Sequence, residues 1–201
     1  MPEISDLVAY LQSIHLPRCF NPYAQIDTEI DLPHADKIRS KNLELYLTEM
    51  KAKSPQTMWV GEALGYRGGK CSGIPFTDTY QLTQSLSDYS IPTSNPIKET
   101  TARIVHDVLD NLEVQPLFWN IFPFHPYQGQ NFHSNRPPIS SEIRLGYKIF
   151  QKINSIFDVR SIYAIGRKAH HELKRNGIQS TYIRHPSRGG ANVFRKTILY
   201  Q

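Results

Sequence analysis

Short apolar runs that alternate with helical segments are the feature that most constrains this chain. Each run is rich in β-branched and aromatic residues, and the segments between the runs carry apolar residues at helical spacing. Strands separated by helices pair in parallel, because a crossover helix returns the chain to the same edge of the sheet. The sequence therefore predicts an α/β fold, a three-layer α/β/α sandwich with a central four-stranded parallel sheet. The predicted strands span residues 56–60, 116–121, 160–166 and 179–183, and the predicted helices span residues 4–15, 35–53, 98–112, 142–157, 167–176 and 191–199.

Length and composition narrow the function classes. The 201 residues favour one domain, 1–201, without an internal repeat or linker. No run approaches the ~18 apolar residues of a membrane span, and the N-terminus lacks the basic and apolar regions of a signal peptide. Two cysteines, Cys19 and Cys71, are too few for a disulfide framework or a four-thiolate cluster. We therefore expect a cytoplasmic monomer that needs no cofactor and does not bind membranes.

The positive charge is concentrated in the last quarter of the chain. The formal net charge is +5, yet residues 160–201 contain nine Lys or Arg residues and one Glu. A basic segment around a glycine-rich loop is typical of proteins that bind a phosphate backbone. The alternative is that these are solvated side chains on ordinary helices.

The glycine-rich loop spans residues 184–192 and reads Arg-His-Pro-Ser-Arg-Gly-Gly-Ala-Asn. It follows the last predicted strand and precedes a predicted helix, so it lies at the carboxyl edge of the sheet, where α/β proteins bind ligands. His185 supplies a titratable ring beside the Ser187 hydroxyl, and the two glycines permit close approach to a partner. The loop is either part of a binding site or a basic surface turn with an incidental histidine.

Two earlier segments also place polar or aromatic groups at strand ends. Residues 61–65, Gly-Glu-Ala-Leu-Gly, follow the first predicted strand directly, and a glycine there permits a tight turn with exposed backbone N–H groups. The same loop continues to Phe76, an aromatic residue after Pro75 that is suited to presenting a flat ring to a flat ligand. Asn120 stands near the end of the second predicted strand.

In order and spacing, these segments resemble the three motifs of the uracil-DNA glycosylase superfamily. The motifs are residues 61–65 with Phe76, residues 119–123 (Trp-Asn-Ile-Phe-Pro), and residues 185–187 (His-Pro-Ser), and the likeness covers about residues 55–195. The first motif is most similar to the Gly-Glu-Ala-Pro-Gly form of the iron–sulfur branch. Leu64 replaces the proline of that form, and the four cluster cysteines are missing, so the resemblance implies a cluster-free relative with a uracil-DNA glycosylase-like fold.

The resemblance implies an enzyme of base excision repair that flips uracil out of DNA and hydrolyses its N-glycosidic bond. Phe76 would stack on the base and Asn120 would read its Watson–Crick edge, since one amide both donates and accepts hydrogen bonds. His185 would be catalytic by donating to the uracil O2 as negative charge develops there. Glu62 would polarise the attacking water, stabilise the sugar cation or merely order its turn. The remaining implied contacts are base-binding Gly61, Ala63 and Leu64, and DNA-backbone-binding Arg184, Ser187, Arg188, Gly189 and Asn192.

Several alternatives remain open. Ala63 stands where many members of the superfamily have a water-activating aspartate, which favours a catalytically weak or inactive nucleic-acid-binding protein. The substrate base could instead be hypoxanthine or xanthine. Phe76 could be an ordinary core aromatic, and Asn120 an amide that caps a turn. His125 and His133 lack a matching set of cysteines or carboxylates, so we expect no metal site.

Overall fold

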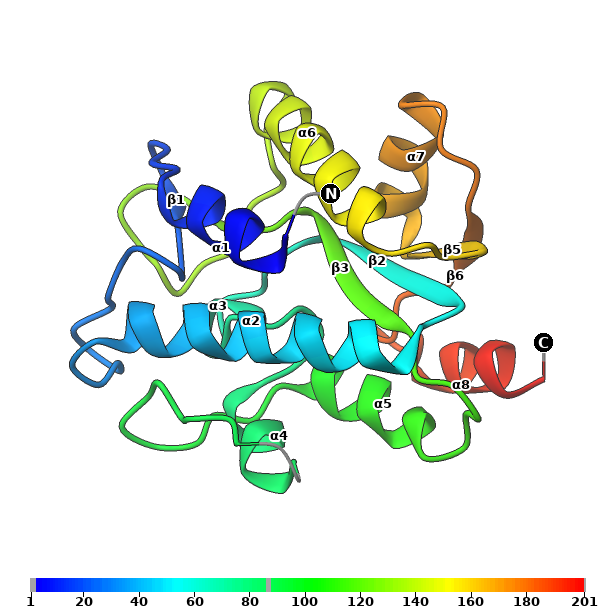
Figure 1. Ribbon diagram of the computed structural model, residues 1–201, viewed down its shortest axis with the longest axis horizontal. Helices are drawn as coiled ribbons and strands as arrows, with labels where there is room; N and C mark the ends of the chain where they lie inside the picture. The colour runs from blue at the N-terminus through cyan, green and yellow to red at the C-terminus, as the bar shows by residue number, and fades with distance from the viewer. Residues whose placement is uncertain (1–2, 86–87, 201) are drawn as a thin grey trace.

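The central sheet has the predicted parallel arrangement. The computed structural model describes residues 3–85 and 88–200. Within these ranges lies a four-stranded sheet of order β3-β2-β5-β6 in which every neighbouring pair is parallel (Figure 1). The predicted α/β fold and sheet are confirmed. The strands are β2 (Thr57–Ala63), β3 (Leu117–Phe122), β5 (Ser161–Ile165) and β6 (Thr181–Ile183).

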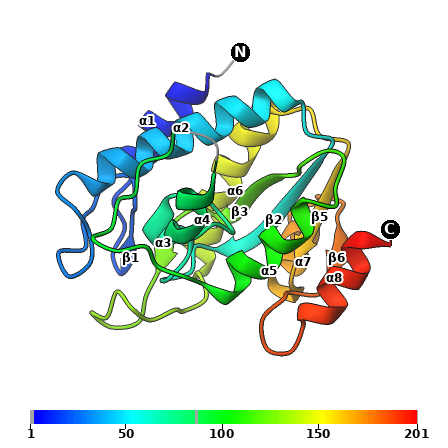
Figure 2. The ribbon, with the colours of Figure 1, turned by 90° about the horizontal axis from the view of Figure 1, so that it is seen from below.

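Helices cover both faces of this sheet. We call one face the α5 face, where Trp59 packs on Phe118 and on Phe194 of α8 (Ala191–Leu199), and His106 of α5 (Thr100–Leu109) also meets Phe118. Figure 2 shows α5 and α8 in front of the sheet on this side. The opposite α7 face is covered by α6 (Ser140–Ile156) and α7 (Arg167–Arg175). Because side chains alternate along a strand, residues two apart face the same layer.

The remaining helices lie at the side of the sandwich. Helix α2 (Ala35–Lys53) has the predicted bounds, and α1 (Ile4–Gln12), which packs on α2 and α6, is shorter than predicted.

Helix α5 is also shorter than predicted, because the Glu99 carboxylate accepts the Ala102 N–H and starts the helix there. Helix α6 begins two residues before the predicted start, where the Glu142 carboxylate accepts the Ile139 N–H at 2.8 Å.

Two further parts of the chain contain elements that were not among the predicted strands and helices. Strand β2 continues through residues 61–63, and the loop after it contains two short helices, α3 (Gly69–Ser72) and α4 (Thr79–Gln84). The segments around residues 19 and 125 form a small antiparallel sheet of β1 (Cys19–Phe20) and β4 (His125–Pro126). These elements depend on contacts between distant parts of the chain, which local sequence patterns do not contain.

None of the helices that the structure describes combines the length and the apolar character that crossing a membrane requires.

A buried arginine fixes the segment between β1 and α2. The Arg39 guanidinium pairs with both carboxylate oxygens of Asp31 at 2.9 Å and donates to the backbone oxygens of Pro22 and Gln25 at 2.7 Å. Its side chain is 1% exposed. The guanidinium also lies over the Phe20 ring, 5.5 Å from its centroid. Arg39 therefore ties α2, β1 and the intervening loop into one unit.

We predict that Arg39→Ala destabilises the fold by about 3–5 kcal/mol, because it leaves the buried Asp31 carboxylate without its partner. Urea unfolding followed by circular dichroism measures this change. The control is Lys41→Ala on the exposed side of the same helix, for which we expect a change within about 0.5 kcal/mol. Equal effects of the two substitutions would contradict the role of Arg39.

Candidate active site

The carboxyl ends of β2 and β3 bring three predicted site residues together. Gly61 and Asn120 are partners in the parallel register. A Cβ atom added at Gly61 would collide with Asn120 Oδ1 and would lie 2.8 Å from Phe76 Cζ. The amide and the ring therefore both approach the same glycine, and no larger residue fits there without moving one of them. We call these three residues, Gly61, Asn120 and Phe76, the base pocket.

Phe76 reaches this position in a strained conformation. Its φ of 55° lies in the left-handed region, which costs a non-glycine residue about 1–3 kcal/mol. Hydrogen bonds hold the residues on both sides: the Ser72 hydroxyl donates to the Thr77 carbonyl at 2.7 Å, and the Thr77 hydroxyl donates to the Pro75 carbonyl at 3.2 Å. The ring packs edge-on against Phe118, with centroids 5.6 Å apart, and stays partly exposed. The loop therefore presents the ring instead of burying it.

Asn120 brings an unused amide to the pocket. The residue is 4% exposed, yet no group within residues 3–85 and 88–200 hydrogen-bonds its side chain. Its amide atoms are not among the fully enclosed side-chain atoms without a partner in the described residues, so they retain some contact with the surface. The Asn120 side chain therefore has both a carbonyl acceptor and N–H donors available for a ligand.

His185 lies in the loop after β6, at the same carboxyl edge as the base pocket. Its Nδ1 accepts the Ser187 backbone N–H at 3.1 Å and lies 2.8 Å from the Ser187 hydroxyl oxygen. Because Nδ1 is an acceptor, the neutral ring carries its proton on Nε2. Burial, together with the positive charge of Arg184, lowers the pKa of His185 from 6.5 to about 4. At pH 7 the ring is therefore a neutral donor through Nε2.

Close backbone packing and the sheet register set the position of His185. A Cβ atom on Gly190 would collide with the His185 carbonyl oxygen, and one on Gly166 would lie 3.3 Å from His185 Cβ. The register pairs Ile183 with Ile165 and Tyr163 with Trp59, so Ile183 lies on the α5 face. His185 follows two residues later, in the continuation of that face.

Glu62 is not part of the base pocket. It lies between Gly61 and Ala63 in β2, so its side chain points to the α7 face, where Lys168 Nζ is 3.4 Å from its carboxylate. Burial raises the pKa of Glu62, and Glu172 adds to this, whereas Lys168 opposes it. The carboxylate borders a separate depression of about 390 Å³, together with Lys168, His171 and Glu172. The predicted catalytic role of Glu62 therefore lacks support from its geometry.

Ala63 and Leu64 differ in the groups that they make available to a ligand. Ala63 shares the face of Gly61 but brings only a methyl group. The Leu64 N–H donates to the Phe124 carbonyl at 3.1 Å, and the Leu64 carbonyl oxygen lies 2.8 Å from His125 Nδ1. The Leu64 N–H is therefore already used within the protein, and the base contact of Leu64 stays a prediction to which this N–H does not contribute.

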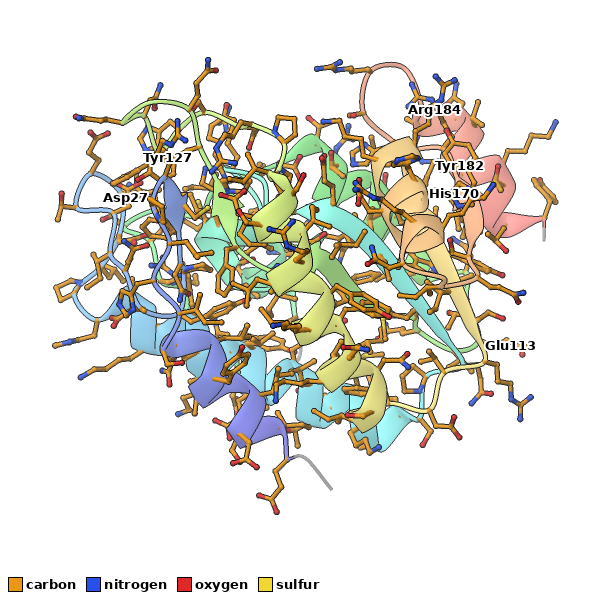
Figure 3. The ribbon with its side chains drawn as sticks, turned by 90° about the horizontal axis from the view of Figure 1, so that it is seen from above. Asp27, Glu113, Tyr127, His170, Tyr182 and Arg184 are labelled. Atoms are coloured by element: carbon orange, nitrogen blue, oxygen red, sulfur yellow. The ribbon has the colours of Figure 1, made fainter. Side chains whose placement is uncertain are left out.

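The predicted DNA-contacting residues fall into two groups. The Arg184 guanidinium donates to the carbonyl oxygens of His185 and Arg188, both at 3.2 Å, so it braces its own loop, and Ser187 is engaged by His185. The other three, Arg188, Gly189 and Asn192, are exposed, and the described residues offer no hydrogen-bond partner for the Arg188 and Asn192 side chains. Figure 3 shows Arg184 beside Tyr182 and His170 at the end of the molecule away from Asp27 and Tyr127.

One cluster has the composition of a metal site. Asp27, Glu29 and His133 form the single group of three such side chains found among the described residues. However, the Lys70 ammonium already binds one carboxylate oxygen of Asp27. The same oxygen lies 3.1 Å from His133 Nε2. Lys70 and Asp27 are both almost fully buried. The ammonium thus occupies the place that a cation would take, and we interpret the cluster as an ion-pair network.

A larger cleft, of about 640 Å³, lies between α2, α4 and α5. Thr77, His106 and Phe118 line part of it, so it borders the residues that support Phe76. The sequence patterns did not indicate this cleft or the roles of Thr77 and His106. The available signal for His106 was its position on the inner face of the amphipathic helix predicted over residues 98–112.

Comparisons with known proteins identify the fold. No family model matches the chain, and no curated protein matches it. Among solved structures, the crystal structure of wild-type SMUG2 from Pedobacter heparinus is similar, with a TM-score of 0.69. The two chains share 12% sequence identity, and the match covers 99% of this chain and 96% of that chain. The likeness shows that the two share the same fold over nearly their whole lengths.

We predict that His185 is an Nε2–H tautomer at pH 7 and titrates near pH 4, which ¹H–¹⁵N NMR of the imidazole nitrogens measures. Because the folded pKa lies below the unfolded one, the unfolded chain binds the proton first, and this residue lowers stability as the pH falls from 6.5 to about 4. Arg184→Ala should move the midpoint upward, since it removes a positive charge. A wild-type midpoint at 6.5 would contradict the buried, neutral ring.

Proposed function

We propose that this protein is a monofunctional DNA glycosylase that hydrolyses the N-glycosidic bond of uracil in DNA. The observation that carries the proposal is the base pocket, in which the unpartnered Asn120 amide and the Phe76 ring meet over Gly61. Two further facts support it. His185 is a neutral donor at the same edge of the sheet, and the chain shares its fold with SMUG2, a DNA glycosylase.

The pocket suits uracil for a chemical reason. Uracil offers O4 as an acceptor and N3–H as a donor, and the two ends of the Asn120 amide match both. Cytosine offers an amine and an unprotonated N3, so the amide orientation that matches uracil would set donor against donor and acceptor against acceptor. Each unmet group in a desolvated pocket costs about 1–3 kcal/mol. Phe76 adds a face on which the extruded base stacks.

The proposed reaction breaks the bond between the sugar C1′ and the base N1. The electron pair leaves with the base, and the negative charge spreads onto O2 and O4. Water adds to C1′ and releases a proton, which the departing base or solvent takes up. The Nε2–H of His185 donates to O2 as its charge grows, and loss of one such donor typically lowers the rate by about 10²–10³.

The first motif supplies no carboxylate to the pocket. Glu62 points toward Lys168 on the α7 face, and Ala63 carries only a methyl group. Stabilisation of the leaving base is therefore the main catalytic contribution in the proposed reaction. The same observation favours a second candidate, a catalytically weak or inactive protein that still binds extruded bases in DNA.

The proposed DNA contacts come from the loop before α8. Arg188, Gly189 and Asn192 are exposed and would meet the phosphates beside the extruded nucleotide. Arg184 and Ser187 hold the loop in shape and would contact phosphate only secondarily. The excess of Lys and Arg in residues 160–201 favours the same partner.

A panel of oligonucleotides that each carry one uracil, cytosine, hypoxanthine or xanthine tests the proposal. We expect alkali-labile breaks at uracil and none at cytosine. Asn120→Asp should abolish the breaks at uracil, because a carboxylate repels O4. Retention of the uracil strand without breaks would instead support the inactive binding protein, and breaks only at hypoxanthine or xanthine would reassign the base.

We predict that Gly61→Ala lowers uracil excision at least about 100-fold, since the new methyl group must displace Asn120 or Phe76. Single-turnover kinetics on the uracil strand measure the effect. The matched control is Gly65→Ala, four residues along the same motif, where an added Cβ meets nothing within 4 Å. The control should keep near-wild-type excision. Similar losses in both variants would show that the close approach at Gly61 is not what matters.

A further inference from the structure

His106 is a partly buried histidine that the proposed chemistry does not use. It lies in α5, and its Nε2 is 3.2 Å from the Thr77 hydroxyl oxygen. The Thr77 hydroxyl already donates to the Pro75 carbonyl, so it accepts the Nε2–H of His106. The Phe76 backbone lies near the ring and favours its protonated form. His106 therefore contacts Thr77, the residue after Phe76, directly.

The Phe118 ring links the same two residues from the sheet. Phe118 meets Phe76 edge-on at 5.6 Å and 71°, and it meets His106 at 6.0 Å and 61°. Aromatic pairs prefer such tilted arrangements, in which the positive edge of one ring faces the negative face of another. The histidine thus supports Phe76 through Thr77 and through a shared aromatic neighbour.

The charge state of His106 suits this role. Burial lowers the pKa of His106 to about 4, although Asp110 and Asp107 oppose the shift. The ring is neutral at pH 7, so it donates through one nitrogen without placing a positive charge behind the pocket. Such a charge would compete with the hydrogen bonds that hold the loop.

We propose that His106 is a positioning residue of the base pocket, which holds Phe76 in its left-handed conformation so that the ring is ready to stack on the extruded base. The inference rests on the proposed function. His106 does not touch the base in this arrangement, and it acts through Thr77 and Phe76. Without it, the Phe76 backbone is free to relax from φ 55° and carry the ring away from Gly61.

The test compares two oligonucleotides that the protein cannot cleave. One carries 2′-fluoro-2′-deoxyuridine, which keeps the base, and the other carries tetrahydrofuran at the same position, which lacks it. His106→Leu should weaken binding of the uracil strand about tenfold, because stacking on a misplaced ring is largely lost. It should leave binding of the tetrahydrofuran strand unchanged. His106→Gln, whose amide nitrogen can replace Nε2, should restore the wild-type affinity.

Thr77→Val provides a second route if His106→Leu does not fold. It removes only the hydroxyl that accepts from His106 and donates to Pro75. It should weaken binding of the uracil strand selectively, but by less than His106→Leu does. Equal loss of affinity for both strands would assign His106 a general structural role and overturn the proposal. Unchanged affinity for the uracil strand in these variants would also overturn it. Wild-type protein that binds the uracil strand no better than an undamaged strand would instead overturn the proposed function.

Discussion

The parallel pairing of β2 with β3 is the constraint on which the candidate site depends. It sets Gly61 directly beside Asn120, with Val60 beside Trp119 one step earlier. Because side chains alternate, a slip of one residue would turn the Asn120 amide toward the opposite layer. A residue with a side chain at position 61 would fill the space that the amide and the Phe76 ring share. The register and the glycine together make a pocket from two strand ends.

The same alternation decides which charges reach the pocket. Gly61 and Ala63 face α5, so Glu62 must face α7, where Lys168 neutralises it. The groups that remain at the pocket are an amide, an aromatic ring and, at the same edge, a neutral imidazole. Such surroundings suit an uncharged base in its ground state. When negative charge develops on a departing base, a fixed donor in a poorly solvated site stabilises it more than water would.

The sequence predicted much of the fold but less of the site. Strand and helix periodicities predicted the parallel sheet, and the motif order placed Gly61, Asn120 and His185 at one edge. The direction of the Glu62 side chain could not be predicted. The strand was expected to end at residue 60, so the alternation of side chains between the two faces was not extended to residue 62. The Leu64 N–H is used by Phe124, a contact between distant segments. The support of Phe76 by His106 is non-local for the same reason.

Backbone strain supports a functional role for the Phe76 loop. Among the described residues, Arg18, His34, Ser54 and Arg188 also have positive φ, and Ser54 has the ordinary place of such a residue, just after the C-terminus of α2. Phe76 has no such explanation, since it lies between α3 and α4 and its ring is only partly buried. A bulky residue held in a strained conformation persists where the surroundings over-determine it and the strain serves a purpose. Here Ser72, Thr77 and His106 form the hydrogen bonds around the loop, and the result is a partly exposed ring beside the Asn120 amide.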